Sequence, residues 1–221
     1  MATEIEIKLI LGSLGDHARV AAALTALAVA PVRRIDQVNY YLDTMDRALH
    51  AQQAMARLRV ADGAVQLTVK VRPQLLDGVM RVTELEAALP DDMAGPWRIA
   101  PPSKTDLRID SQGWLQDAAL LKHPLPPTAV LHCLGAMRNT RQVFTVPRTV
   151  WDAGPGDVHV ELDRVHFGAG ADQAERFEIE VEIPDAPVLL PRLQAWLDGL
   201  GVDHQPAAES KYAQFLRLSQ S

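Results

Sequence analysis

The stretch Glu4-Ile5-Glu6-Ile7-Lys8-Leu9 decides how this sequence is expected to fold. Charged and aliphatic residues alternate in it without interruption, which is the pattern of a β-strand with one polar face and one apolar face. Phe177 to Ile183 repeats the pattern late in the chain. Further strands are predicted at 38–42, 56–60, 65–72, 79–89, 141–146 and 158–164, while 130–134 is either a strand or the end of a helix.

Turn and helix signals separate these strands. Asp62-Gly63 predicts a hairpin between the strands at 56–60 and 65–72. Val150-Trp151 is expected to pair across a Gly-Pro-Gly turn with the strand that begins at Val158. Asp16 is expected to cap a helix that runs to about Leu27. Other helices are predicted at 91–97, 113–122, 188–200 and 207–218.

The charged side chains of the predicted strands are sorted by sign. Alternate residues of a strand share a face, so each of the following sets lies together: Glu4 with Glu6 and Lys8, Arg57 with Arg59, Lys70 with Arg72, Glu84 with Glu86, Glu161 with Asp163, and Glu178 with Glu180 and Glu182. In a flat, solvated sheet, adjacent like charges would be unfavourable. A sheet closed into a barrel with its charges inward explains the sorting, and the helices would then cover its apolar outer faces.

The two signs of charge suit different parts of one ligand. Arginine and lysine bind phosphate oxygens, and arginine can do so with two hydrogen bonds at once. Carboxylates, water and phosphate oxygens are the ligands that Mg²⁺ and Mn²⁺ prefer. Several carboxylates close together repel one another unless a cation lies between them. The expected ligand is therefore a polyphosphate with a bound divalent metal.

Composition limits the classes of partner. The chain has 221 residues and a formal net charge of -6, so bulk charge gives no reason to expect nucleic acid or an anionic membrane as a partner. Cys133 is the single cysteine, which rules out a disulfide within the chain. No apolar stretch suits a signal peptide or a membrane span. We expect a single domain, residues 1–221, in the cytoplasm, as a monomer or a homodimer.

Taken in chain order, these motifs resemble the CYTH family, the triphosphate tunnel metalloenzymes. Glu4-Ile5-Glu6-Ile7-Lys8 resembles the family's Glu-x-Glu-x-Lys signature. The later matching segments are Asn39-Tyr40-Tyr41-Leu42-Asp43-Thr44, Arg57-Leu58-Arg59, Leu67-Thr68-Val69-Lys70, Glu84 and Glu86, Arg141, Glu161-Leu162-Asp163, Glu178-Ile179-Glu180-Val181-Glu182 and Ser210-Lys211. The ordered set covers nearly the whole chain.

The resemblance implies an α+β fold: a closed antiparallel β-barrel of eight strands, or tunnel, with a charged interior and helices packed outside. It also implies Mg²⁺ or Mn²⁺ as the cofactor and a small-molecule triphosphate or polyphosphate as the substrate. Family members include inorganic triphosphatases, thiamine triphosphatases and a class of adenylyl cyclases. The chain is most similar to the bacterial inorganic triphosphatase branch, which predicts hydrolysis of tripolyphosphate to diphosphate and phosphate.

The resemblance also assigns roles to single residues. Metal ligands are expected among Glu4, Glu6, Glu84, Glu86, Glu161, Asp163, Glu178 and Glu180. Substrate-binding residues are expected to be Lys8, Arg57, Arg59, Lys70, Arg72, Arg141 and Lys211. Glu4, Glu6 and Lys8 are expected to be catalytic, with water attacking the terminal phosphorus in line. Asp43 is expected to be a turn residue rather than a ligand.

The sequence departs from the family pattern at two places. The family often has an arginine two residues before the first glutamate of the Glu84 strand, where this chain has Val82. The neighbouring Arg81 is expected to point outward unless a bulge shifts the register. The cyclase members tend to carry a His-Phe pair near the N-terminus, and this chain has none before Glu4.

Several alternatives stay open. A thiamine or nucleoside triphosphatase is the nearest one, and an adenylyl cyclase is more distant. A non-catalytic polyphosphate-binding module would keep the basic faces but has no need of the acidic ones. A purely structural barrel would have to bury many charges without a ligand, which is unfavourable.

Overall fold

The computed structural model describes residues 2–89, 91–99, 106–108, 121–126, 128–168 and 174–219. Its strands are β1 (Ala2–Leu11), β2 (Arg33–Asp43), β3 (Ala54–Ala61), β4 (Ala64–Leu76), β5 (Val79–Ala88), β6 (Asp106–Arg108), β7 (Val130–Pro147), β8 (Asp157–Phe167), β9 (Ala174–Glu182) and β10 (His204–Pro206). The α-helices are α1 (Leu14–Leu27), α2 (Asp91–Ile99), α3 (Ala186–Gly199) and α4 (Lys211–Ser219), and the 3₁₀ turns are η1 (His50–Gln52) and η3 (Arg148–Trp151).

The order of hydrogen-bonded strands closes on itself. It runs β1-β5-β4-β3-β2-β7-β8-β9, and β9 pairs again with β1. Two short strands lie outside this ring, because β10 pairs with β1 and β6 pairs with β7. The fold is therefore a closed antiparallel β-barrel of eight strands with helices outside it, an α+β fold, as the sequence predicted.

Contacts between Cα atoms divide the chain into two units. The first comprises Met1–Thr3, Gln37–Pro73 and Val82–Arg138, and the second comprises Glu4–Asp36, Gln74–Arg81 and Asn139–Ser221. The boundaries fall inside β1, β2, β4, β5 and β7, so each of these strands contributes residues to both units. The single domain expected from the sequence stays a prediction.

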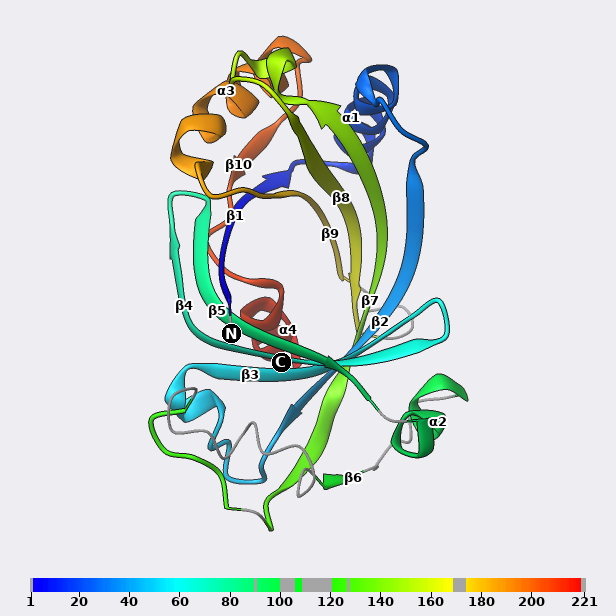
Figure 1. Cartoon of the computed structure of the whole chain (residues 1–221), viewed down its shortest axis with the longest axis vertical. Helices are drawn as coiled ribbons and strands as arrows, with labels where there is room; N and C mark the ends of the chain where they lie inside the picture. The colour runs from blue at the N-terminus through cyan, green and yellow to red at the C-terminus, as the bar shows by residue number, and fades with distance from the viewer. Residues whose placement is uncertain are drawn as a thin grey trace. The chain divides into compact units, whose positions relative to one another are not determined.

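The second unit has its own hydrophobic core. Its strands contribute the aliphatic residues of their alternating patterns, such as Ile7 and Leu9 of β1 and Ile179 of β9, which have no exposed surface. Helices α1 and α3 complete this core through residues such as Leu24 and Leu193. Figure 1 shows both helices and η3 at one end of this unit, with η3 against α3. The charged residues of the same strands consequently lie on the face opposite the core.

The first unit has a separate core. Leu58 of β3 and Leu67 of β4 lie directly opposite each other, and both are fully buried. Helix α2 contributes Trp97, whose ring lies 5.3 Å from that of Tyr40 on β2. Alternation on these strands again places the aliphatic side chains in the core and the arginine and lysine side chains on the other face.

Two hairpins use the same turn chemistry. Asp62-Gly63 joins β3 to β4, as predicted, and both residues have a positive φ, 50° and 77°. Asp77-Gly78 joins β4 to β5 with φ values of 48° and 80°. This combination is typical of the type I′ turn that tight hairpins prefer. Only the first of these two hairpins was among the sequence predictions, although Asp77-Gly78 carries the same signal as Asp62-Gly63.

Two helices begin differently from the sequence prediction, and one segment that the prediction left open is a strand. Ser13, not Asp16, caps α1, because the Ser13 hydroxyl accepts a hydrogen bond from the Asp16 backbone N–H at 3.1 Å. Segment 130–134 is a strand, the start of β7. The helix predicted at 207–218 begins at Lys211, because residues 204–206 pair with β1 and Ser210 accepts from the Ala213 N–H. Residues 113–120 of another predicted helix lie outside the described residues.

The pairing predicted for Val150-Trp151 is wrong. These residues belong to the 3₁₀ turn η3, which follows Pro147 and ends at Asp152 with a φ of 49°. A proline cannot donate to a strand ladder, so the pairing of β7 ends there. Trp151 is buried instead, edge-on to Trp196 of α3 with ring centroids 5.7 Å apart.

Gly78 and Gly63 allow a matched test of close packing in two similar turns. A Cβ at Gly78 would lie 3.1 Å from the Lys8 carbonyl oxygen and 3.2 Å from the Pro206 Cβ, whereas one at Gly63 meets nothing within 4 Å. Each Gly→Ala change should cost roughly 1–2 kcal/mol for its positive φ. Gly78→Ala should cost roughly 1–3 kcal/mol more, because its surroundings are overpacked. Denaturant unfolding measures both losses, and equal losses would show that the contact with β1 carries no weight.

Candidate functional site

The register of three neighbouring strands aligns charged residues in rows across the sheet of the second unit. Lys8 on β1 lies opposite Glu180 on β9, and Glu180 lies opposite Glu161 on β8. In the next row, Glu178 on β9 lies opposite Asp163 on β8. Because opposite residues of antiparallel strands share a face, all five side chains occupy the charged face of this sheet.

Helix α4 brings a lysine into the middle of these carboxylates. The Nζ atom of Lys211 lies 2.7 Å from an oxygen of Asp163, 2.8 Å from one of Glu178 and 2.7 Å from one of Glu180. All three carboxylates are buried, and Asp163 and Glu178 have no exposed surface. An ammonium group has three N–H donors, and Lys211 donates to Asp163 and Glu180 while its charge also pairs with Glu178.

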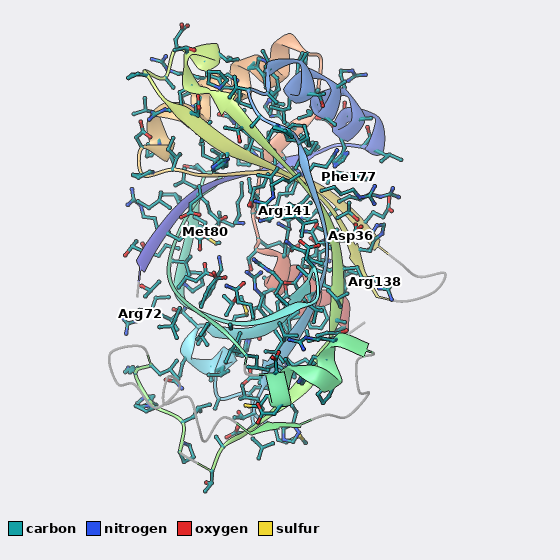
Figure 2. The ribbon with its side chains drawn as sticks, turned by 45° about the vertical axis from the view of Figure 1, so that its right-hand side comes forward. Asp36, Arg72, Met80, Arg138, Arg141 and Phe177 are labelled. Carbon is teal, nitrogen blue, oxygen red and sulfur yellow. The ribbon has the colours of Figure 1, made fainter. Side chains whose placement is uncertain are left out.

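Strand β7 contributes an arginine to the same group. The Nε and Nη2 atoms of Arg141 donate to the two oxygens of Asp163, at 2.8 and 2.7 Å. Nη2 also donates to Glu180 at 2.6 Å, and Nη1 forms an ion pair with Glu161. Figure 2 labels Arg141, and the two-pronged contact with Asp163 fixes the orientation of its guanidinium plane.

Two further cations complete the group. The Nζ atom of Lys8 lies 3.1 Å from an oxygen of Glu6 and is also paired with Glu180. The Nη2 atom of Arg176 lies 2.8 Å from the oxygen of Glu178 that Lys211 does not contact. We call these residues the acidic cluster: Glu6, Glu161, Asp163, Glu178 and Glu180 with Lys8, Arg141, Arg176 and Lys211. Its five carboxylates and four cations leave one excess negative charge.

The cations determine the ionisation of the buried carboxylates. Burial alone would raise the pKa of Asp163, but Arg141 and Lys211 outweigh burial and hold that pKa at about 2. The pKa of Glu180 is held well below its usual range in the same way, by Lys211, Lys8 and Arg141 against burial. Burial raises the pKa of Glu161, and the charge of Arg141 offsets only part of that effect.

The carboxylates in turn keep both lysines charged. Burial alone would lower the pKa of Lys8, but Glu180, Glu6 and Glu178 raise it above its usual value. The pKa of Lys211 is raised against burial by Asp163, Glu178 and Glu180. Both ammonium groups therefore stay protonated throughout the neutral range and act as fixed positive charges.

The first unit holds a second charged group, in which cations predominate. Lys70 and Glu84 form an ion pair at 2.7 Å, while the guanidinium of Arg57 is 4.0 Å from the same carboxylate. The Nε atom of Arg57 is buried and has no hydrogen-bond partner among the described residues. Arg59 lies on the same strand face as Arg57 and contacts Asn39 at 3.5 Å. We call Arg57, Arg59, Lys70 and Glu84 the basic cluster.

A family model matches this chain over most of its length. The CYTH domain model matches residues 2–190. The chain belongs to the CYTH family. Among curated proteins, no relative matches it.

Solved structures extend the comparison of this CYTH chain. A candidate adenylyl cyclase from Hippeastrum, reported to have a dominant triphosphatase activity, is 27% identical, with a TM-score of 0.77 over 97% of this chain and 95% of the other. A candidate adenylate cyclase from Bacillus halodurans is 21% identical, with a TM-score of 0.61 over 97% of this chain and 99% of the other. The second likeness shows the fold alone.

Not every residue that the sequence singled out joins one of the two clusters. Glu4 is half-buried, whereas Glu86 is exposed and accepts hydrogen bonds from Gln66 and Thr68 of β4. Arg72, labelled in Figure 2, is exposed within β4, and its φ of 53° interrupts the alternation that grouped it with Lys70. The assignments of all the predicted site residues stay predictions.

Two other expectations concern Arg81 and Asp43. Arg81 is exposed and Val82 is buried, as the unshifted register predicted. Asp43 is fully buried and accepts backbone hydrogen bonds from Thr44, Leu49 and His50, at 2.8, 2.9 and 3.1 Å. Asp43 is the last residue of β2, and its side chain holds the turn that follows that strand. That it is not a ligand stays a prediction.

Arg176 is the member of the acidic cluster that the sequence analysis missed. It lies two residues before Glu178, on the same face of β9. The alternation of that strand therefore contained the signal. The strand predicted from the sequence begins at Phe177, whereas β9 begins at Ala174 and includes Arg176.

The CYTH family is generally metal-dependent, which poses the question of where a metal could bind. The acidic cluster offers only oxygen ligands, the type that Mg²⁺ and Mn²⁺ prefer. Within the part of the chain that the structure describes, however, no three His, Cys, Asp or Glu side chains form a metal-binding group by themselves. Lysine and arginine contact the same carboxylate oxygens that a metal would use, so binding there requires an exchange of cations.

The lowered pKa values predict how acid affects the metal-free protein. A carboxyl group whose pKa is lower in the folded than in the unfolded chain adds stability above the unfolded value and loses it as the pH falls through the folded value. Between about pH 4 and pH 2, Asp163 should therefore withdraw roughly 2–3 kcal/mol from the free energy of unfolding. Protonation of Glu180 should lower the free energy of unfolding further, because its pKa is also lowered in the folded chain.

Denaturant unfolding in excess chelator at a series of pH values measures this loss. The control is Glu180→Gln, which removes one of the two lowered groups and should make the decline below pH 4 shallower. Parallel curves for the wild type and the variant would contradict the assignment of Glu180 as a strongly paired carboxylate.

Proposed function

We propose that this CYTH protein hydrolyses a triphosphate, preferably inorganic tripolyphosphate, to diphosphate and phosphate with the help of Mg²⁺ or Mn²⁺. The observation that carries the proposal is the acidic cluster, in which three buried carboxylates lie 2.7–2.8 Å from one cation, the Nζ atom of Lys211. Carboxylates alone would repel a polyphosphate, so the carboxylates of this cluster would bind the cations that in turn contact the phosphates. The dominant triphosphatase activity reported for the Hippeastrum protein supports the same reaction.

The residues of the acidic cluster are suited to different tasks. Glu6, Glu161, Asp163, Glu178 and Glu180 would hold a divalent ion, with Glu4 as a further ligand. When bound, the ion supplies positive charge to the phosphate oxygens and to the leaving diphosphate. Lys8 and Lys211 carry long flexible stems with a single charge at the end. Each can leave a carboxylate oxygen and contact a phosphate oxygen by rotating its own side chain.

The basic cluster is suited to binding phosphate directly. Arg57 is largely buried, yet it lies 4.0 Å from the carboxylate of Glu84, to which Lys70 is closer at 2.7 Å. A guanidinium whose buried Nε–H has no hydrogen-bond partner among the described residues gains from an anion, because a buried donor without a partner is costly. We therefore propose Arg57, Arg59 and Lys70 as phosphate-binding residues, with Arg72 contributing less because it is exposed.

The preference for an inorganic substrate rests on what the sequence offers around the phosphates. The sequence contains no recognisable motif for reading a nucleotide base. Of the described helices, none has the length and apolar character needed to cross a membrane. Location in the cytoplasm and a monomeric or homodimeric state stay predictions.

Phosphate release from a panel of substrates tests the reaction. Tripolyphosphate, thiamine triphosphate and ATP are each incubated with Mg²⁺, with Mn²⁺ or with excess chelator. We expect hydrolysis that requires the metal, with the highest kcat/KM for tripolyphosphate. Full turnover in chelator would refute the metal, and a higher kcat/KM for ATP or thiamine triphosphate would move the assignment to one of the alternative triphosphatases. Release of diphosphate from ATP with formation of cyclic AMP would identify a cyclase.

A pair of variants separates metal binding from phosphate binding. Glu6→Gln removes a proposed metal ligand and should raise the metal concentration needed for half-maximal activity. Arg57→Ala removes a charged phosphate contact and should lower kcat/KM for tripolyphosphate roughly tenfold to a hundredfold, with the metal requirement unchanged.

The control for this pair is Arg72→Ala, which removes the same charge from an exposed position. Its effect should be smaller than that of Arg57→Ala. Metal and tripolyphosphate titrations of activity are compared for the three variants, each shown to be folded by its circular dichroism. An unchanged metal requirement in Glu6→Gln would mean that β1 supplies no metal ligand.

A further inference from the structure

Arg176 lies at the junction between strand β9 and helix α4. Its side chain is almost fully buried, and it extends from the charged face of β9 two residues before Glu178. In addition to its ion pair with Glu178, its Nη2 atom donates to the backbone carbonyl of Glu209 at 3.1 Å. Its Nη1 atom donates to the side-chain oxygen of Gln214 at 2.9 Å.

The residues that Arg176 contacts flank Lys211 along the chain. Glu209 lies two residues before Lys211, and Gln214 lies one helical turn after it. A single guanidinium therefore holds the chain just before α4 and the first turn of α4 at the same time. The third contact, with Glu178, ties both to the carboxylate that Lys211 itself contacts at 2.8 Å.

We propose that Arg176 is a positioning residue that fixes α4 on β9 and thereby places the ammonium group of Lys211 in the acidic cluster. This inference rests on the proposed function for its catalytic consequence, but not for the anchoring itself. Arg176 acts through Lys211 and Glu178 and does not contact the substrate. Its planar group, with donors pointing in fixed directions, suits this task better than the single charge of a lysine.

Other contacts of α4 keep the helix folded and docked without Arg176, so the role of Arg176 is to position the helix. Phe215 and Leu216 are buried, so the helix stays docked through its apolar side when the arginine is removed. Glu178 would also keep its contact with Lys211. Loss of Arg176 should therefore loosen the start of α4 and leave the rest of the unit intact.

The first test measures anchoring without reference to activity. Hydrogen exchange of the backbone amides is compared between the wild type and Arg176→Gln. We expect faster exchange in Lys211–Ser219 and unchanged exchange in Leu14–Leu27, the helix α1. The control is Arg164→Gln. Arg164 lies on β8, next to β9, and pairs at 2.6 Å with the exposed Glu175. Unchanged exchange in α4 of Arg176→Gln would overturn the proposal.

The second test asks whether Arg176 acts through Lys211. In the wild-type background, Arg176→Gln should lower kcat/KM for tripolyphosphate about tenfold, which is what loss of a charged hydrogen bond typically causes. In a Lys211→Ala background the same change should have less than about a twofold effect, because the group being positioned is gone. Arg176→Lys should restore part of the loss, and Arg164→Gln should cause none.

The outcomes separate this inference from the proposed function. An equal loss from Arg176→Gln in both backgrounds would mean that Arg176 supports the fold generally, and the proposal would fail while the triphosphatase assignment stands. A wild-type protein without triphosphatase activity would refute the proposed function, and the exchange experiment would still decide whether Arg176 anchors α4.

Discussion

Carboxylates that are buried together must be matched by cations, and the second unit is organised around that requirement. An unpaired buried charge costs several kcal/mol even after the surroundings relax. Asp163 has no exposed surface and is contacted by Arg141 and Lys211, while Glu178, equally buried, is contacted by Lys211 and Arg176. These cations come from β7, α4 and β9. The acidic face of β8 and β9 is therefore tolerated only when all of these elements are assembled.

The same strands build both the hydrophobic core and the acidic cluster, so an error in register would disrupt both. On β1, Ile7 and Leu9 have no exposed surface in the core, and Glu6 and Lys8 alternate with them on the opposite face. A slip by one residue would move the charges into the core and the aliphatic side chains into the cluster. Neither face could accommodate the exchange, so the pairing of Lys8 with Glu180 is fixed by the packing on the other side of the sheet.

Alternation explains why the sequence predicted so much of this architecture. A period of two is a local property, so the charged faces of β1, β8 and β9 could be assigned from short segments. What could not be assigned was the partner of each charge, since Lys8 and Glu180 meet through a pairing that spans most of the chain. Local backbone changes also escaped prediction. Arg72 was grouped with Lys70 by parity, but its left-handed conformation breaks the alternation and leaves it exposed.

The cations of the acidic cluster differ in how readily they could give way to a metal, and the difference follows from their geometry. Arg141 holds both oxygens of Asp163 with two parallel hydrogen bonds and also contacts Glu180, so its removal would break several directional contacts at once. Lys211 makes one contact with each of three carboxylates, from a flexible stem whose charge points in no fixed direction.

The cluster retains one negative charge in excess, which favours a divalent over a monovalent cation at its centre. Under the proposed function, Lys211 is therefore the group suited to exchange, and an ammonium released from carboxylates becomes available to a phosphate. Such an exchange is productive only if the released side chain stays close, which requires that the start of α4 be held in place.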